Sequence, residues 1–311
     1  MQKFKSNGKI LLTGEYAVLN GAKSLALPTK LGQSMEVSKG NENEISWRSH
    51  DENEKTWFQA KFEINEGKFS VLLLPGDQSK PEIKETARRL KQILSAAFKQ
   101  NPEAFSKNKG YHILTRLDFN SKWGLGTSST LINNLAQWLE IDPYKLLKES
   151  FGGSGYDIAA ARSDFPITYQ LTKTGPVSFT ADFNPVFKDR LFFVYLNKKQ
   201  NSREAIAHYR NQPKEDLGDL TEKISGITEQ VIKCGNLEEF KLLLSAHESL
   251  ISKAIKLPKI QTELFHDFPG LIKSLGGWGG DFVLATGEEP EKEYFRRKGY
   301  PTIFNYRDLI K

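Results

Sequence analysis

One nine-residue segment constrains this chain more than any other, because it places two glycines and four hydroxyl residues just before an apolar pattern. It runs from Lys122 to Thr130 (KWGLGTSST), and helical spacing follows at once in Leu131, Ile132, Leu135, Ala136 and Leu139. Glycines let a backbone turn tightly and approach a ligand closely. A helix N-terminus offers unpaired N–H groups and the positive end of a dipole. The segment therefore predicts a cradle for phosphates, although an ordinary N-cap at Thr127 or Ser128 also explains the hydroxyls.

Two further glycine clusters lie far from the first. They are 152–155 (GGSG) and 276–280 (GGWGG), and three such loops in one chain suggest one shared ligand site. The chain has no Gly-x-x-x-x-Gly-Lys-Ser/Thr sequence, and the first cluster lacks the third glycine of a dinucleotide fingerprint. A P-loop enzyme and a dinucleotide-binding fold are therefore not expected.

Composition and charge limit the class of protein. The chain has 311 residues, which favours about two domains, and its formal net charge is +6. Basic residues are scattered and never form a run of five, so the excess favours an acidic or phosphorylated small substrate over nucleic acid. No apolar run approaches 18 residues and the N-terminus lacks the apolar stretch of a signal peptide, so a cytoplasmic protein with no membrane partner is expected. Cys234 is the only cysteine; it excludes an intramolecular disulfide and is interpreted as a buried structural thiol.

Periodicity predicts a mixture of strands and helices. We expect strands within 8–19, 31–74, 111–118, 191–196, 282–285 and 302–304. Helices are expected at 82–99, 128–140, 143–151, 203–211, 217–234, 237–254, 258–266 and 290–298. The polar segment 41–55 is interpreted as an exposed hairpin tip or irregular loop. A turn at 184–185 suggests a boundary between a domain of residues 1–185 and one of residues 186–311.

Three segments together resemble motifs of the GHMP kinase superfamily, which includes galactokinases and homoserine, mevalonate and phosphomevalonate kinases. They are 8–19 (GKILLTGEYAVL), similar to an N-terminal substrate motif, 124–129 (GLGTSS), similar to the ATP-phosphate loop, and 276–281 (GGWGGD), similar to a C-terminal glycine-rich motif. Their order and wide separation also match the superfamily. The resemblance implies an α+β kinase with a ribosomal protein S5-like N-terminal domain, a ferredoxin-like C-terminal domain, and ATP and Mg²⁺ as cofactors.

Several details lean toward phosphomevalonate kinases. Tyr16 stands where mevalonate kinases usually carry histidine, and Lys122 stands where they have a proline-rich lead-in. The segment 153–161 (GSGYDIAAA) and Asp281 resemble phosphomevalonate kinases. The same Gly-Tyr-Asp-Ile-Ala string also resembles a bacterial GHMP kinase subfamily of unassigned substrate.

The resemblance implies roles for individual residues. Asp157 matches the catalytic base and Lys9 the lysine that supports it, although a turn aspartate and a surface lysine are the alternatives. Ser128 matches a hydroxyl that ligates Mg²⁺, and Glu149 is the candidate carboxylate ligand, with a solvated helix-end glutamate as the alternative. The ATP phosphates would lie on Lys122, Gly124, Leu125, Gly126, Thr127, Ser128 and Ser129.

The acceptor is expected to meet a second set of residues. These are Glu15, Tyr16, Ser154, Gly155, Arg162, Ser202, Arg203, Gly277, Trp278 and Gly279. Cations that suit an anionic acceptor are Lys9, Lys122, Arg162, Lys198 and Arg203, although for each of them a solvated surface charge is the favoured alternative. Ser129, Thr130 and Trp278 depart from the small residues usual in the superfamily.

The histidines do not indicate a metal site. None of the five pairs with another ligand at a metal-like spacing that a second pair supports, so zinc is not expected. His247 and Glu248, adjacent on an expected helix, are interpreted as a surface pair.

The expected function is ATP-dependent phosphorylation of a small anionic or hydroxy-acid substrate in the mevalonate pathway of isoprenoid biosynthesis. Phosphomevalonate is the first choice of acceptor and mevalonate the second, and the protein would be a monomer or homodimer. One alternative is a decarboxylase acting on diphosphomevalonate, against which the Gly155-Tyr156-Asp157 segment argues. Another is a catalytically inactive nucleotide-binding regulatory module. A nucleic-acid-binding role ranks last.

Overall fold

The computed structural model describes residues 1–212 and 217–311. The described chain forms two compact units: residues 1–8, 31–121 and 126–162 make the first, and residues 9–30, 122–125 and 163–311 make the second. Strands β1 (Gln2–Thr13) and β2 (Ser24–Lys39) contribute residues to both units. Residue 185, after which the sequence predicts a domain boundary, lies within the second unit. The division into domains of residues 1–185 and 186–311 stays a prediction.

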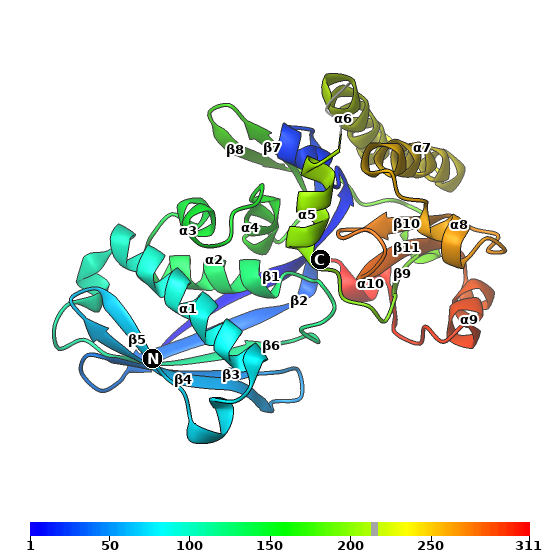
Figure 1. Ribbon diagram of the computed structural model, residues 1–311. Helices are drawn as coiled ribbons and strands as arrows, with labels where there is room; N and C mark the ends of the chain where they lie inside the picture. The colour runs from blue at the N-terminus through cyan, green and yellow to red at the C-terminus, as the bar shows by residue number, and fades with distance from the viewer. Residues whose placement is uncertain (213–216) are drawn as a thin grey trace. The chain divides into compact units, whose positions relative to one another are not determined.

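The first unit is a sheet with helices on one face (Figure 1). Its strand order is β5-β4-β3-β6-β2, in which β3 pairs parallel with β6 and the other neighbours are antiparallel. Its strands are the first-unit parts of β1 and β2 with β3 (Glu44–His50), β4 (Thr56–Asn65), β5 (Lys68–Leu72) and β6 (Tyr111–Leu117). Its helices are α1 (Pro81–Gln100), α2 (Thr127–Leu139), α3 (Pro143–Ser150) and α4 (Tyr156–Ala161), with short 3-10 helices η2 (Pro75–Asp77) and η3 (Pro102–Phe105).

The core of this unit lies between the sheet and helices α1, α2 and α3. Trp47 and Phe62 from the strands are almost fully buried, and they pack with Leu94 of α1 and Leu135 of α2. Each such side chain contributes about 1.5–3 kcal/mol by leaving water. The apolar face expected for the helix at 82–99 is buried throughout, which confirms that prediction.

The expectation of an exposed hairpin tip or irregular loop over 41–55 is wrong. Strand β3 occupies its middle and lies between β4 and β6. Ile45, Trp47 and Ser49 alternate toward the core and are buried. The surrounding charged residues masked a period-two pattern of only three inward positions, which is enough for a strand with a partner on each side.

The second unit contains a four-stranded antiparallel sheet of order β10-β11-β9-β12. Helices α8 and α9 supply Ile260 and Phe295 to its core, and Phe192 and Val283 come from the sheet. A hairpin of β7 and β8, which sequence periodicity did not reveal, pairs with the β2 segment Ser24–Ala26.

A separate apolar cluster joins α6 and α7 to the short helix η1. The strands of this unit are β7 (Ile167–Thr172), β8 (Gly175–Thr180), β9 (Leu191–Tyr195), β10 (Ile272–Leu275), β11 (Phe282–Thr286) and β12 (Ile303–Asn305). Its helices are η1 (Ala17–Asn20), η4 (Lys188–Arg190), α5 (Ser202–Arg210), α6 (Leu217–Lys233), α7 (Leu237–Ile255), α8 (Ile260–Leu264), α9 (Glu289–Arg297) and α10 (Tyr306–Leu309).

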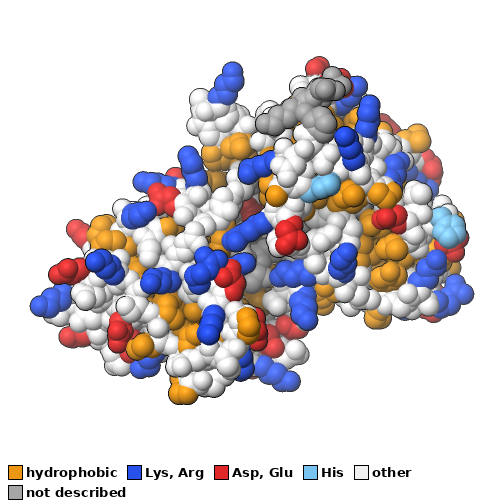
Figure 2. Space-filling model, in the orientation of Figure 1, with side chains coloured by type: hydrophobic (Ala, Val, Ile, Leu, Met, Phe, Trp, Pro, Cys, Tyr) orange, Lys and Arg blue, Asp and Glu red, His pale blue; other side chains and the backbone are white. Residues whose placement is uncertain are grey.

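The distribution of surface charge and the hydropathy of the helices agree with what the sequence predicts. Figure 2 shows Lys and Arg side chains spread over the face in view with Asp and Glu among them. Among the described residues, no helix combines the length and hydropathy that crossing a bilayer requires. Cys234 is half-buried just after α6, rather than fully buried as expected, and burial raises the pKa of its thiol.

Candidate functional site

Helix α2 begins at the end of the first glycine cluster, as expected. Gly126 is its N-cap residue, with a φ of 101° that favours glycine, and no described side chain caps this N-terminus. The N–H groups of the first helical turn therefore remain available to an anion. Ser128 is exposed in this turn, so its hydroxyl faces the same solvent. The arrangement has the donors and the dipole direction that phosphate binding requires.

Two of the three residues that depart from the GHMP pattern, Ser129 and Thr130, are buried in this turn. The Ser129 hydroxyl donates to the carbonyl of Gly126 at 3.0 Å. Thr130 is fully buried, and its hydroxyl bonds Gln33 Oε1 at 3.0 Å. Both hydroxyls thus support the loop from within the first unit.

The cluster 152–155 leads directly into α4. Gly152, Gly153 and Gly155 all have positive φ, and Gly155 is the N-cap of a helix whose first turn carries Asp157. Asp157 is half-buried and its Oδ1 accepts the N–H of Ile158 at 3.1 Å. Ser154 is also half-buried, whereas Arg162 is exposed at the end of α4. Glu149 is exposed near the end of α3.

Lys9 lies against the first half of the phosphate-loop segment, within the second unit. Its Nζ donates to the carbonyl of Gly124 at 2.8 Å, and its backbone N–H donates to Leu125 at 2.9 Å. The expected catalytic lysine and the loop are therefore held together by two hydrogen bonds. Lys122, at the start of the segment, is exposed, and its carbonyl accepts the Tyr195 hydroxyl at 3.2 Å.

Asp281 connects this segment to the third glycine cluster. A Cβ on Gly124, whose φ is +70°, would lie 2.4 Å from Cγ of Asp281. The Asp281 Oδ1 accepts the N–H of Gln200 at 3.0 Å. Burial raises the pKa of this carboxyl, while the N–H of Gln200 and the positive charges of Lys9 and Lys199 oppose the rise. The sequence singled out Asp281 by resemblance, and the structure gives it contacts with Gly124 and Gln200.

Gln200 also shapes the third cluster. A Cβ on Gly277 would lie 2.5 Å from the Cβ of Gln200, and one on Gly280 would lie 2.6 Å from its Cγ. The side chain of Gln200 donates to the carbonyl of Trp278. Gly277 and Gly280 therefore leave the space that the side chain of Gln200 occupies. The sequence did not indicate a role for Gln200.

Glu15 lies in a buried charged network. Its Oε1 pairs with the ammonium of Lys273, which also donates to the carbonyl of Ser274 at 2.8 Å. Glu15 is 1% exposed and Lys273 is 0% exposed. Burial raises the pKa of Glu15 to about 7 although Lys273 opposes the rise. In this structure Glu15 therefore meets Lys273 and not solvent.

The interpretation of His247 and Glu248 as a surface pair is wrong. His247 Nε2 accepts the backbone N–H of Gly14 at 2.8 Å, and Glu248 Oε1 accepts both the N–H and the hydroxyl of Ser274. Both side chains are buried in α7. Burial and the charge of Lys273 lower the pKa of His247, so the ring is neutral and accepts the N–H of Gly14. These residues connect α7 to the first motif and to the start of the third.

Among the described residues, some buried side-chain atoms of this network have no hydrogen-bond partner. Within the part of the chain that the structure describes, these are Glu15 Oε2, His247 Nδ1 and Glu248 Oε2. Burial raises the pKa of Glu248 as well as that of Glu15, and the charge of Lys273 opposes both rises. Sequence reasoning missed Lys273 although it lies only three residues before Gly276.

Tyr16 and Trp278 belong to the apolar cluster of α6, α7 and η1. The ring of Tyr16 stacks on Tyr209 at 5.4 Å, and its hydroxyl accepts the backbone N–H of Trp278 at 3.1 Å. Trp278 is 5% exposed, and its indole donates to Pro258 at 2.8 Å. The large side chain therefore anchors the third glycine loop to the core. Gly279, at a φ of +82°, follows it in the same loop.

Ser202 and Arg203 open α5, as expected, and both are exposed. The side chain of Asn201 accepts the N–H of Arg203 at 3.1 Å and so caps this helix. The N-terminus of α5 is thus less open to an anion than that of α2. Lys198 is exposed in the loop before it.

The exposed hydroxyl of Ser128 is the described feature that bears on the expected Mg²⁺ site. Among the described residues, no group of three or more His, Cys, Asp or Glu side chains could hold a metal ion. Mg²⁺ keeps several waters and takes one or two protein ligands with substrate phosphates. The exposed Ser128 hydroxyl at an uncapped helix N-terminus fits that requirement.

Comparison with known proteins places the fold. No protein-family model matches the chain, and no curated protein matches its sequence. The structure is similar to the Methanococcus jannaschii mevalonate kinase, with a TM-score of 0.67 at 18% identity over 98% of this chain and 97% of that one. It is also similar to the Streptococcus pneumoniae phosphomevalonate kinase solved with phosphomevalonate and AMPPNP, with a TM-score of 0.66 at 14% identity over 98% and 99%.

A sugar kinase shares the same architecture. The Lactococcus lactis galactokinase solved with galactose matches with a TM-score of 0.65 at 13% identity, over 97% of this chain and 92% of that one. All three are GHMP kinases, and the expected α+β architecture is confirmed. The protein has the fold of the GHMP kinase superfamily.

Proposed function

We propose that this protein is an ATP-dependent phosphotransferase that phosphorylates a small anionic hydroxy acid, with phosphomevalonate as the first choice of acceptor and mevalonate as the second. The observation that carries the proposal is the uncapped N-terminus of α2, which follows two left-handed glycines and presents the exposed Ser128. The similarity to kinases of both acceptors supports it.

The residues of the loop would bind the phosphates of ATP. Backbone N–H groups of Thr127, Ser128 and Ser129 would donate to phosphate oxygens, and the helix dipole would favour their negative charge. Ser128 and Glu149 would hold Mg²⁺, which neutralises charge on the phosphates when bound. Lys9, bonded to the carbonyl of Gly124, would add a positive charge beside the loop.

Asp157 would act on the acceptor. As the acceptor oxygen forms its bond to the γ-phosphorus, the bond from that phosphorus to the ADP oxygen breaks, and Asp157 takes the proton of the acceptor hydroxyl. Asp157 lies in the first turn of α4, which begins after the glycine N-cap Gly155. A phosphorylated acceptor loses its proton more readily than an alcohol, so Asp157 matters less for phosphomevalonate than for mevalonate.

ADP release with Mg-ATP tests this proposal across mevalonate, phosphomevalonate, homoserine and galactose. Asp157→Asn is compared with Asp182→Asn, a matched change at an exposed aspartate of the second unit. We expect release with one acidic acceptor, loss of at least about 100-fold in Asp157→Asn for an alcohol acceptor, and no loss in Asp182→Asn. Equal activity of both variants on an alcohol acceptor would contradict the role of Asp157. Carbon dioxide release from diphosphomevalonate would favour the decarboxylase, and ATP binding without turnover would favour an inactive module.

A further inference from the structure

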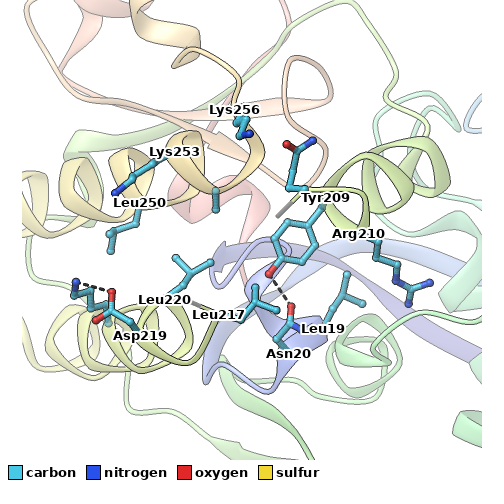
Figure 3. Close-up of a pocket in the computed structure, with 13 residues that line it drawn as sticks. Leu19, Asn20, Tyr209, Arg210, Leu217, Asp219, Leu220, Leu250, Lys253 and Lys256 are labelled. Carbon is cyan, nitrogen blue, oxygen red and sulfur yellow. Dashed lines mark hydrogen bonds and ion pairs between the residues drawn. The ribbon is translucent and has the colours of Figure 1, made fainter. Parts of the chain in front are cut away.

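The second unit contains a cavity that the proposed function does not use. Its volume is about 510 Å³, within the range of about 300–1,000 Å³ found for small-molecule pockets. Described residues of η1, the end of α5, the start of α6 and the end of α7 line it. Figure 3 shows leucines from three of these elements pointing into one space.

The floor of the cavity is apolar and packs against the buried cluster beneath it. Partly buried side chains on this floor pack against the buried cluster of α6, α7 and η1; they are Leu19, Leu217, Leu220, Leu250 and Ala254. Tyr209 is 6% exposed, and its hydroxyl donates to Asn20 at 2.6 Å (Figure 3). An apolar group placed here would leave water without first displacing a polar partner.

The wall of the same cavity is positively charged. Four basic side chains stand against one acidic side chain, Asp219, which pairs with Lys223 at 2.7 Å. The structure gives no ion pair, among described residues, to the other three, Arg210, Lys253 and Lys256. They are exposed and lie at the periphery of the cavity (Figure 3).

These two features together specify the ligand. An inorganic anion would leave the leucine floor exposed to water. A purely apolar molecule would make no favourable electrostatic interaction with Arg210, Lys253 and Lys256. Arginine and lysine bind phosphate through charge-assisted hydrogen bonds, and a phosphate can carry two negative charges. We propose that this cavity binds a small amphipathic organophosphate, with its hydrocarbon chain on the leucines and its phosphate at the basic periphery to which Arg210, Lys253 and Lys256 belong.

The site has a direct connection to the motifs described above. Tyr209, in the floor, stacks on Tyr16, whose hydroxyl accepts the N–H of Trp278. A ligand in the cavity therefore rests on the cluster that anchors the third glycine loop. The proposal itself concerns binding, so it holds or fails independently of the kinase activity.

The test is calorimetric titration of the full chain with n-octyl phosphate, inorganic phosphate and 1-octanol as separate probes. Arg210→Gln/Lys253→Gln is compared with Lys84→Gln/Lys91→Gln, which removes two exposed charges from α1 in the first unit. We expect saturable binding of n-octyl phosphate, at least about tenfold weaker in the first double variant and unchanged in the second. Inorganic phosphate and 1-octanol should each bind at least about tenfold more weakly than n-octyl phosphate.

Several results would overturn the proposal. They are the absence of saturable n-octyl phosphate binding, equal weakening in both double variants, displacement of n-octyl phosphate by Mg-ATP, and inorganic phosphate binding as tightly as n-octyl phosphate. If the first double variant does not fold, hydrogen exchange on the unaltered protein decides. Protection by n-octyl phosphate should then appear in 217–223 and 250–254, and protection only elsewhere would contradict the site.

Discussion

Replacing Gly124 by alanine tests the contact between the phosphate-loop segment and Asp281. The new Cβ would lie 2.4 Å from Cγ, 2.5 Å from Oδ2 and 2.8 Å from Oδ1 of Asp281, so the carboxyl must move. Its movement would break the hydrogen bond from the N–H of Gln200, which costs about 1–3 kcal/mol. The φ of +70° at Gly124 costs an alanine a further ~1–2 kcal/mol.

Gly299→Ala is the matched control in the same unit. Gly299 also has a positive φ, of +88°, but no atom of the described residues lies within 4 Å of its Cβ position. It therefore carries the backbone cost of about 1–2 kcal/mol without a clash. Both alanines restrict the unfolded chain equally, so the free energy of unfolding should fall about 1–3 kcal/mol further in Gly124→Ala than in Gly299→Ala.

Urea unfolding followed by tryptophan fluorescence measures this difference, and Trp123 reports on the segment because its ring contacts Tyr195, Phe282 and Phe304. Asp281→Gly, at a residue with a φ of +52°, completes a double-mutant cycle. In that background Gly124→Ala should cost only about 1–2 kcal/mol, as Gly299→Ala does. Equal losses for Gly124→Ala and Gly299→Ala in the unaltered background would refute the packing of Asp281 on Gly124.

Three other predictions concern the buried network and the helix α2 turn. Lys273→Met leaves Glu15 buried without its cation, so the free energy of unfolding should fall by about 3–5 kcal/mol; a loss below 1 kcal/mol in urea unfolding would contradict the pair. Burial raises the pKa of Glu15 from 4.5 to about 7. The contribution of Glu15 to the free energy of unfolding is therefore complete below pH 4.5 and is lost as the pH rises through 7. Relative to Glu15→Gln, the unaltered protein should therefore lose about 2–3 kcal/mol of stability between pH 5 and pH 8, and parallel pH profiles would disprove the shift. Ser128→Ala should leave urea unfolding unchanged within about 0.5 kcal/mol, because the side chain is exposed, but should raise the Mg²⁺ concentration for half-maximal activity about tenfold; an unchanged Mg²⁺ dependence would remove Ser128 from the metal site.

The sequence predicted the elements whose patterns are long and local. Helix α1 shows its buried face in seven regularly spaced apolar residues, and the glycine N-cap of α2 follows from the need for a positive φ at Gly126. Strand β3 could not be found in the same way, because only Ile45, Trp47 and Ser49 face inward among charged neighbours. Its parallel pairing with β6 depends on residues more than 60 positions away.

In the candidate site, too, the residues within local motifs were predicted and those that only the fold brings together were not. Lys9 and the loop around Gly124 are motif residues, and the structure joins them by hydrogen bonds. Lys273 and His247 belong to elements that carry no catalytic motif, and only the fold brings them to Glu15 and Gly14. From sequence alone, a histidine next to a glutamate on a helix is interpreted as a solvated pair. Only the fold shows that other elements cover His247 and Glu248.

The most direct test of the central claim is the fate of the γ-phosphate of ATP. ATP radiolabelled in that phosphate is incubated with Mg²⁺, the protein and the acidic acceptor that gives ADP release, and the labelled products are separated. The account predicts that the label appears on the acceptor in a one-to-one ratio with ADP. Label found only in inorganic phosphate, or retained in ATP that binds the protein without turnover, would contradict it.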